Sequence, residues 1–94
     1  MLSNQQCIFQ VIDRGIDLMK KNVDYTLLRA WQDYSRAILE IVCRSCDKSI
    51  YLDYLSFLIT ISSLSPYDQL KKSIEKLMEI AQRINEYATE ELSD

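Results

Sequence analysis

The near absence of glycine and proline is the feature that most limits what this chain can fold into. Its 94 residues include one glycine and one proline. Sandwiches and barrels of β-strands need many tight turns, and these two residues supply the backbone conformations of most such turns. The sequence therefore predicts a few long elements, and its length suits one domain over residues 1–94.

Apolar residues spaced by three and four predict four helices, at residues 4–21, 24–45, 49–63 and 66–90. Capping signals support three of the starts. Ser3 and Gln6 form a capping box, Asp24 is a good N-cap, and Ser65 precedes Pro66 at the first helical position. Short connections make successive helices antiparallel neighbours, so we expect an all-α fold, an antiparallel bundle of four helices.

Two of the predicted helices, 24–45 and 66–90, carry a clear apolar face. In helix 24–45 this face is Leu27, Trp31, Tyr34, Ile38 and Ile41, widened by Leu28, Leu39 and Val42. In helix 4–21 the apolar pattern is interrupted by Gly15, which costs about 1 kcal/mol relative to alanine inside a helix. We expect another helix to cross closely at Gly15, and a bend is the alternative.

The segment 50–64 is apolar over most of its circumference. Its polar residues form a single thin stripe together with Ser49, which directly precedes the segment. The stripe consists of Ser49, Asp53, Ser56, Thr60 and Ser63. A helix of this kind must be covered nearly all round, so helix 49–63 is predicted to be the most buried of the four. Asp53 is expected to face solvent with its stripe. The alternative is a carboxyl group with a raised pKa at a functional site.

The boundary between the second and third helices is the least clear. Residues 43–49 contain neither glycine nor proline, although Asp47 or Ser49 could cap a new helix. We expect a break here. The alternative is one continuous helix over residues 24–63, because the apolar stripe continues through Leu52 and Leu55.

Composition excludes several kinds of chemistry. The chain has no histidine, which removes the commonest general base and the commonest metal ligand. A single glycine excludes the glycine-rich phosphate-binding loops. We expect no catalytic activity and no cofactor. No signal peptide is recognisable, and the segment 50–64 is too short to cross a bilayer, so we expect a cytoplasmic protein without a membrane interaction.

Cys43 and Cys46 form a C-x-x-C motif near the expected end of a helix. The negative pole of the helix dipole lies there, which is unfavourable for a reactive thiolate. A structural zinc site needs about four ligands, and one chain offers three cysteines and no histidine. We interpret these residues as ordinary small, partly buried cysteines, and a metal site shared by two chains or a redox switch is the alternative.

Aromatic and aliphatic residues that remain after the bundle is built predict an interaction surface. Tyrosine and tryptophan are enriched at the energetic centres of protein interfaces. The candidate residues for a partner or self-association surface are Tyr51, Tyr54, Leu55, Leu58, Trp31 and Tyr34. We therefore expect a small non-catalytic module, such as an adaptor, inhibitor or immunity-like or chaperone-like protein, acting on another protein and forming a homodimer by helix–helix packing.

The alternative function is a helical regulator linked to nucleic acid, such as a repressor or an antitoxin. Arg29, Arg36 and Arg44 lie on one side of the second helix and would contact phosphates. The net charge of −3 and the absence of a long basic run argue against nucleic acid as a partner. An enzyme or redox protein using Cys43 and Cys46 is the third hypothesis.

Overall fold

The computed structural model describes residues 3–44 and 47–92, with side chains up to residue 84. Within these residues the chain forms four α-helices and no β-strand. Their bounds are α1 Asn4–Met19, α2 Tyr25–Arg44, α3 Lys48–Thr60 and α4 Pro66–Leu92. The predicted all-α bundle is confirmed. A continuous helix over residues 24–63 is wrong, because α2 ends at Arg44 and Asp47 caps α3 with a hydrogen bond of 2.9 Å from the Ser49 N–H.

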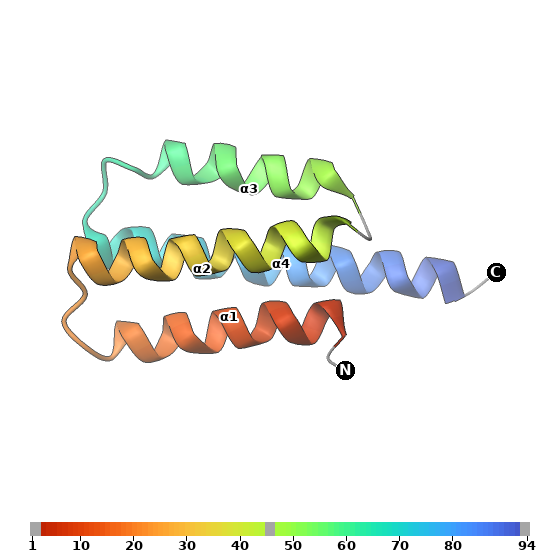
Figure 1. The fold of residues 1–94 in the computed structure, drawn as a ribbon, viewed down its shortest axis with the longest axis horizontal. Coiled ribbons are helices and arrows are strands. Elements are labelled where there is room, and N and C mark those ends of the chain that lie inside the picture. Colours follow the sequence, from red (N-terminus) through yellow and green to blue (C-terminus); the bar gives the residue numbers. More distant parts are fainter. Residues whose placement is uncertain (1–2, 45–46, 93–94) are drawn as a thin grey trace.

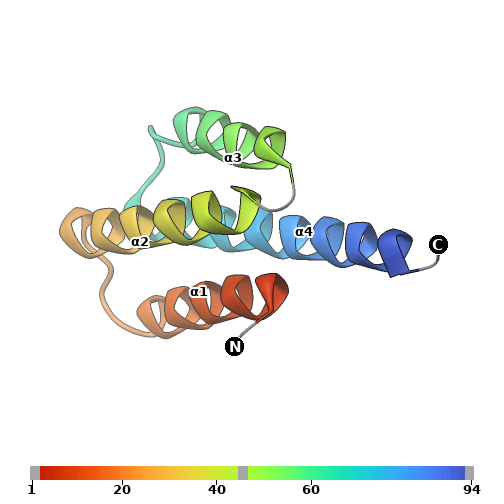
Figure 2. The same cartoon turned by 45° about the vertical axis from the view of Figure 1, so that its right-hand side comes forward.

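The helices run alternately up and down around α2 and α4. In Figure 1, α2 lies in front of α4, and α1 and α3 lie on opposite sides of this central pair. The view in Figure 2 shows the same arrangement after a turn. Both α1 and α3 pack against α2 and α4, and within the described residues α1 does not contact α3.

The predicted caps fix three helix starts. Ser3 and Gln6 form the expected capping box, with the Gln6 N–H donating to Ser3 Oγ over 3.1 Å. Asp24 Oδ1 accepts the Leu27 N–H at 2.8 Å. Ser65 caps α4 in the same way. These bonds satisfy N–H groups that have no partner inside their own helix, so each helix begins where its cap stands.

Helix α3 is not the most buried helix, contrary to the prediction. Only Ile50 and Tyr54 of its residues are buried, whereas α2 buries six side chains. The reason is that α3 has only 13 residues and packs against two helices rather than being surrounded. Its predicted polar stripe is confirmed as exposed, and Asp53 in that stripe pairs with Lys76 of α4 at 3.1 Å.

Gly15 lets three helices approach closely, as predicted. A Cβ atom at Gly15 would lie 2.9 Å from Trp31 Cζ2 of α2 and 2.9 Å from Ile74 Cδ1 of α4. The space left by the missing side chain is filled by the Trp31 indole, whose Nε1 donates to the carbonyl oxygen of Val11 at 2.9 Å. The glycine is thus part of the packing between α1, α2 and α4.

A buried polar junction joins α2, α3 and α4. The Tyr54 hydroxyl lies 3.0 Å from Ser35 Oγ, and Ser35 in turn donates to the carbonyl oxygen of Gln32 at 2.8 Å. Ser35 has one hydrogen to donate, so Tyr54 is the donor toward Ser35. Burial raises the pKa of Tyr54 to about 12, and the hydroxyls of Ser35 and Ser73 partly oppose that rise.

Candidate functional site

The core-facing side of α2 differs from the predicted one. The buried residues of α2 are Leu28, Trp31, Ser35, Leu39, Val42 and Cys43. Of the five residues at the centre of the predicted face, only Trp31 is fully buried. Ser35 can lie in the core because Tyr54 satisfies its hydroxyl. Leu28, Leu39 and Val42, which widen the predicted face, are buried as predicted. The helix is therefore turned only slightly from the predicted orientation, and one edge of the predicted apolar face, with Leu27 and Ile41, points outward.

This turn leaves an apolar row on the outside of α2, which we call the outer row. Its members step by three, four, three and four, and they are Leu27, Ala30, Tyr34, Ala37 and Ile41. Ile41 is 59% exposed and Leu27 is 39% exposed, whereas Tyr34 is half-buried. The row is about 21 Å long at about 1.5 Å per residue. The side of α2 that is turned away from α4 faces the viewer in Figure 1.

The middle of the outer row is held in place by α1. The guanidinium carbon of Arg14 lies 4.7 Å from the centre of the Tyr34 ring, a cation–π contact. Arg14 and Leu18 of α1 line a shallow groove together with Leu27 and Tyr34 of α2. The Tyr34 ring therefore has one fixed neighbour at the surface, which reduces the entropy cost of binding there.

A row of alternating charges runs beside the outer row. This charged row consists of Arg29, Asp33, Arg36, Glu40 and Arg44. Arg36 pairs with Asp33, and Arg44 Nη2 lies 3.2 Å from Glu40 Oε1. The predicted phosphate contacts Arg29, Arg36 and Arg44 thus lie on one side of α2, but carboxylates stand between them. The charged row presents both signs rather than a basic patch.

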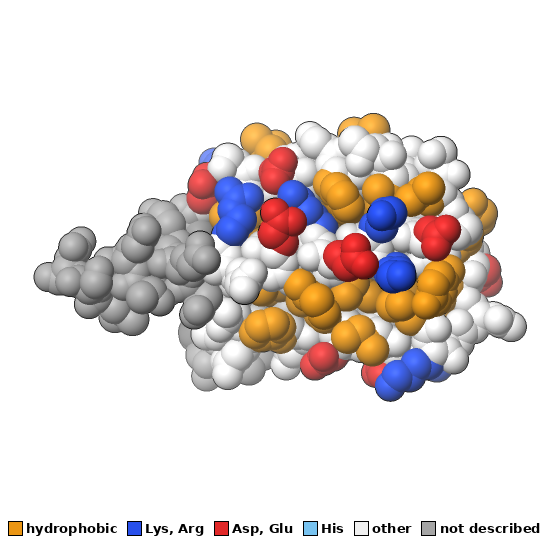
Figure 3. All heavy atoms as spheres, turned by 180° about the vertical axis from the view of Figure 1, so that it is seen from behind, with side chains coloured by type: hydrophobic (Ala, Val, Ile, Leu, Met, Phe, Trp, Pro, Cys, Tyr) orange, Lys and Arg blue, Asp and Glu red, His pale blue; other side chains and the backbone are white. Residues whose placement is uncertain are grey.

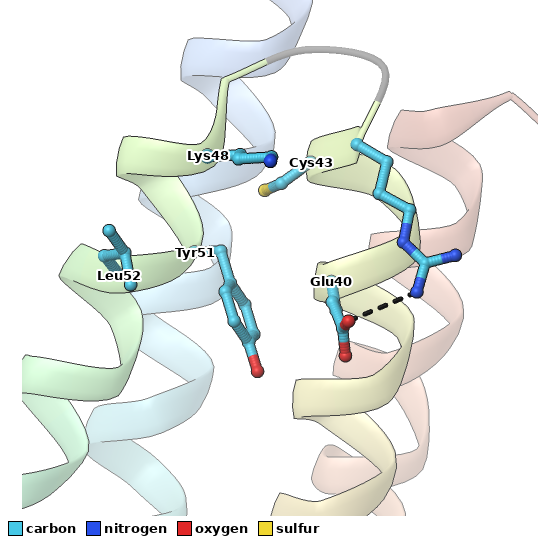
Figure 4. A pocket seen from close by; sticks show the side chains of 6 residues that line it. Glu40, Cys43, Lys48, Tyr51 and Leu52 are labelled. Atoms are coloured by element: carbon cyan, nitrogen blue, oxygen red, sulfur yellow. Dashed lines mark hydrogen bonds and ion pairs between the residues drawn. The ribbon is translucent and has the colours of Figure 1, made fainter.

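A pocket of about 400 Å³ lies between the end of α2 and the start of α3. In Figure 4, Tyr51 points from α3 toward Glu40 of α2, and Lys48 lies near Cys43. Cys43 is buried, and Cys46 lies outside the described residues. Among the residues that the structure describes, no three cysteine or carboxylate side chains are grouped to hold a metal ion.

The residues predicted as an interaction surface do not form one surface. Trp31 and Tyr54 are in the core, so neither can be presented to a partner. The other four, Tyr34, Tyr51, Leu55 and Leu58, are half-buried. Sequence reasoning missed the exposed Leu52 and Ile59, which are 59% and 74% exposed. Leu52 directly precedes Asp53 and Ile59 directly precedes Thr60, two members of the exposed polar stripe of α3. This position beside the stripe is the sequence signal that indicates their exposure.

The opposite side of the molecule has a different character. Figure 3 shows charged side chains across the middle of this side, with apolar side chains in groups above and below them. Exposed charged residues of α4 include Lys72 and Glu79, and exposed apolar ones include Tyr67 and Met78. The apolar side chains on this side thus lie in groups separated by charged residues.

None of the described helices is long and apolar enough to span a membrane. No family model matches the chain, and comparisons with curated proteins and with solved structures found no match either.

Proposed function

We propose that this protein is a non-catalytic, cytoplasmic interaction module that binds another protein through the outer row of α2. The observation that supports the proposal is the apolar row itself, which follows one side of a helix for about four turns. An apolar row at this spacing matches the way in which helices pack into the grooves of other helices. The charged row beside it supplies a polar rim.

The test substitutes Ile41 with lysine. Ile41 is 59% exposed, so the change should alter the free energy of unfolding by less than about 0.5 kcal/mol. Binding should be lost, because a lysine within an apolar contact must be desolvated. Two measurements are made on the wild type and the variant: the mass in solution by light scattering, and the proteins captured from native lysate by the immobilised chain.

The matched control is Ile59→Lys on α3, which is 74% exposed and outside the outer row. The proposal requires that self-association or a captured protein disappears in the Ile41 variant and persists in the Ile59 variant. If every association survives Ile41→Lys, the outer row is not the binding surface and the proposal is wrong.

Measurements on the same wild-type chain and its variants distinguish the alternative function, a regulator linked to nucleic acid, from the proposed one. Binding to duplex DNA or RNA at low salt that weakens steeply with added salt would favour the regulator. Arg29→Gln should then reduce that binding. Absence of binding at low salt removes this alternative.

A further inference from the structure

We propose that the outer row of α2 binds a second copy of this chain, with the two α2 helices packed antiparallel about a two-fold axis near Tyr34. This inference rests on the proposed function and names the partner. It is carried by two features of the surface of α2, the apolar outer row and the charged row, which define nearly the same symmetry centre.

The two ends of the outer row, Leu27 and Ile41, each lie seven residues from Tyr34, whereas the symmetry mate of Ala30 is Ile38, which lies outside the row. A two-fold axis at Tyr34 brings Leu27 opposite the second copy's Ile41, and Tyr34 opposite the second copy's Tyr34. Ala30 then faces the second copy's Ile38, so that a small side chain meets a large one. Tyr34 and Ile38 are half-buried, and Leu27, Ala30 and Ile41 are exposed, so each of these side chains can be reached from outside.

The charged row complements itself about almost the same axis. Arg29 comes opposite the second copy's Glu40, and Asp33 comes opposite the second copy's Arg36. The centre of these pairs lies midway between residues 34 and 35, which is about 0.75 Å from Tyr34 along the helix. Charges and apolar side chains therefore specify one register.

Other arrangements of the two helices lose this match. In the proposed antiparallel dimer the two-fold axis is perpendicular to the helices. This axis places the same side of both copies together, so the two charged rows meet. Parallel packing places the charged rows on opposite sides of the contact, where they do not meet. Moving the antiparallel axis to the point between residues 36 and 37 brings Asp33 opposite the second copy's Glu40, and like charges repel.

The test uses two charge reversals on exposed residues, Arg29→Glu and Glu40→Arg. A dimer of the first variant would hold two contacts between carboxylates, at positions 29 and 40 of opposite copies. A dimer of the second would hold two contacts between guanidinium groups at the same positions. Each variant alone should dimerise about tenfold more weakly than the wild type. When the two variants are mixed, dimers made of two copies of the same variant still hold two contacts between like charges.

A dimer that contains one copy of each variant has different contacts. In a mixed dimer, the position 29 carboxylate of the first variant faces the position 40 guanidinium of the second, so this contact joins opposite charges. The other contact joins the unchanged Glu40 of the first variant and the unchanged Arg29 of the second, which are also opposite in charge. Association in the mixture should return to nearly the wild-type strength.

Dissociation constants are measured by sedimentation equilibrium, and circular dichroism of each variant checks that it is folded. The matched controls are Lys72→Glu and Glu79→Arg, two exposed residues of α4, which should leave association unchanged. Recovery in the mixture supports the inference. Single variants that dimerise like the wild type, or a mixture that does not recover, overturn it.

A wild-type chain that stays monomeric up to about 500 μM, well above the micromolar range of weak specific complexes, also overturns the inference. That result leaves the proposed function standing if a protein captured from lysate is lost with Ile41→Lys. If Ile41→Lys abolishes neither self-association nor the capture of a protein from lysate, the proposed function is rejected. The two failures are therefore distinguishable.

Discussion

Gly15 shows how one residue can set the spacing of three helices. Substitution with alanine should gain about 1 kcal/mol of helix propensity but cost about 1–3 kcal/mol through overpacking. The new methyl group would lie 2.9 Å from an atom of Trp31, whose ring is held by its hydrogen bond to Val11. We expect Gly15→Ala to lower the free energy of unfolding by about 1 kcal/mol, measured by urea denaturation.

A double variant identifies the cause of that loss. Ile74→Val removes Cδ1, one of the three atoms that the added methyl group would meet, and leaves Cγ1 of the same side chain, 3.0 Å away. Gly15→Ala should therefore cost less in the Ile74→Val background than in the wild type, a positive coupling between neighbours. Equal cost in both backgrounds would show that Cδ1 of Ile74 does not limit the space at Gly15.

Tyr54 gives a prediction in alkaline solution. Its pKa is about 12 in the folded chain against 10.0 as the ordinary value, so the folded state favours the neutral phenol. The stability this provides is complete below pH 10 and is lost as the pH rises toward 12, by about 1.4 kcal/mol per pH unit. Tyr54→Phe should cost about 1 kcal/mol at neutral pH, and the difference from wild type should shrink and reverse above about pH 11.

The measurement is urea denaturation of both proteins between pH 8 and pH 12. Tyr25→Phe serves as the control, because Tyr25 is 58% exposed and should show no such crossover. A constant difference between wild type and Tyr54→Phe over this range would mean that the phenol ionises in the folded chain as easily as in the unfolded one.

At the scale of the helices, the sequence was informative about where each element begins but less so about how it is turned. Ser3, Asp24 and Ser65 cap their helices as predicted, since a cap depends on residues a few positions away. The rotation of α2 depends on a distant residue. Ser35 counts as polar in a pattern, yet Tyr54 of α3 makes it a core residue. Local periodicity does not contain that contact.

The rotation of α2 about its axis also explains why the sequence predicts the candidate site only in part. The spacing of apolar residues predicts Leu27, Tyr34 and Ile41 on the core face together with Trp31. The structure separates them, because Trp31 fits beside Gly15 while Leu27 and Ile41 remain exposed. A surface row and a core row on the same helix differ by one residue position, which periodicity alone does not resolve.

Helix α3 should be the least protected element. It buries only Ile50 and Tyr54 and is short, so it can open without disrupting the contacts of α1. Hydrogen exchange followed by NMR should give lower opening free energies for the amides of α3 than for those of residues 69–81 in α4. Equal values in the two helices would mean that α3 opens only when the whole bundle unfolds.

An ion pair connects the exposed stripe of α3 to α4. Asp53 lies 3.1 Å from Lys76 Nζ and 3.7 Å from Arg83 Nη1. Asp53→Asn should lower the opening free energy of α3 by less than about 1 kcal/mol, because the carboxyl group is half exposed to solvent. Asp33→Asn, which removes an ion pair within α2, should leave the exchange of α3 unchanged.

At the scale of the whole molecule, the bundle places α2 where it is covered on three sides. Helices α1 and α3 flank it and α4 lies behind it, so only its outward side remains available (Figures 1 and 2). The exposed residues of this side belong to one straight helix rather than to several loops. A partner that packs there must therefore align with α2, and helix direction becomes a measurable property of the complex.

Spin labels on α2 distinguish the two directions. In the antiparallel dimer, labels at exposed Ala37 lie near the two-fold axis, about 8 Å from each other along the helix, because each residue adds about 1.5 Å. Labels at exposed Thr26 lie near the ends and are separated by about 25 Å along the same axis. In a parallel dimer in register, both positions give the same separation along the helix, which is close to zero.

The labels require a chain whose cysteines are replaced by alanine, and circular dichroism must show that it folds. Distances between labels are then measured by pulsed electron paramagnetic resonance at concentrations where the chain is dimeric. We expect a distinctly longer distance for Thr26→Cys than for Ala37→Cys, since positions farther from the two-fold axis are farther from their symmetry mates. Equal distances at the two positions would contradict the antiparallel arrangement even if the mass in solution is that of a dimer.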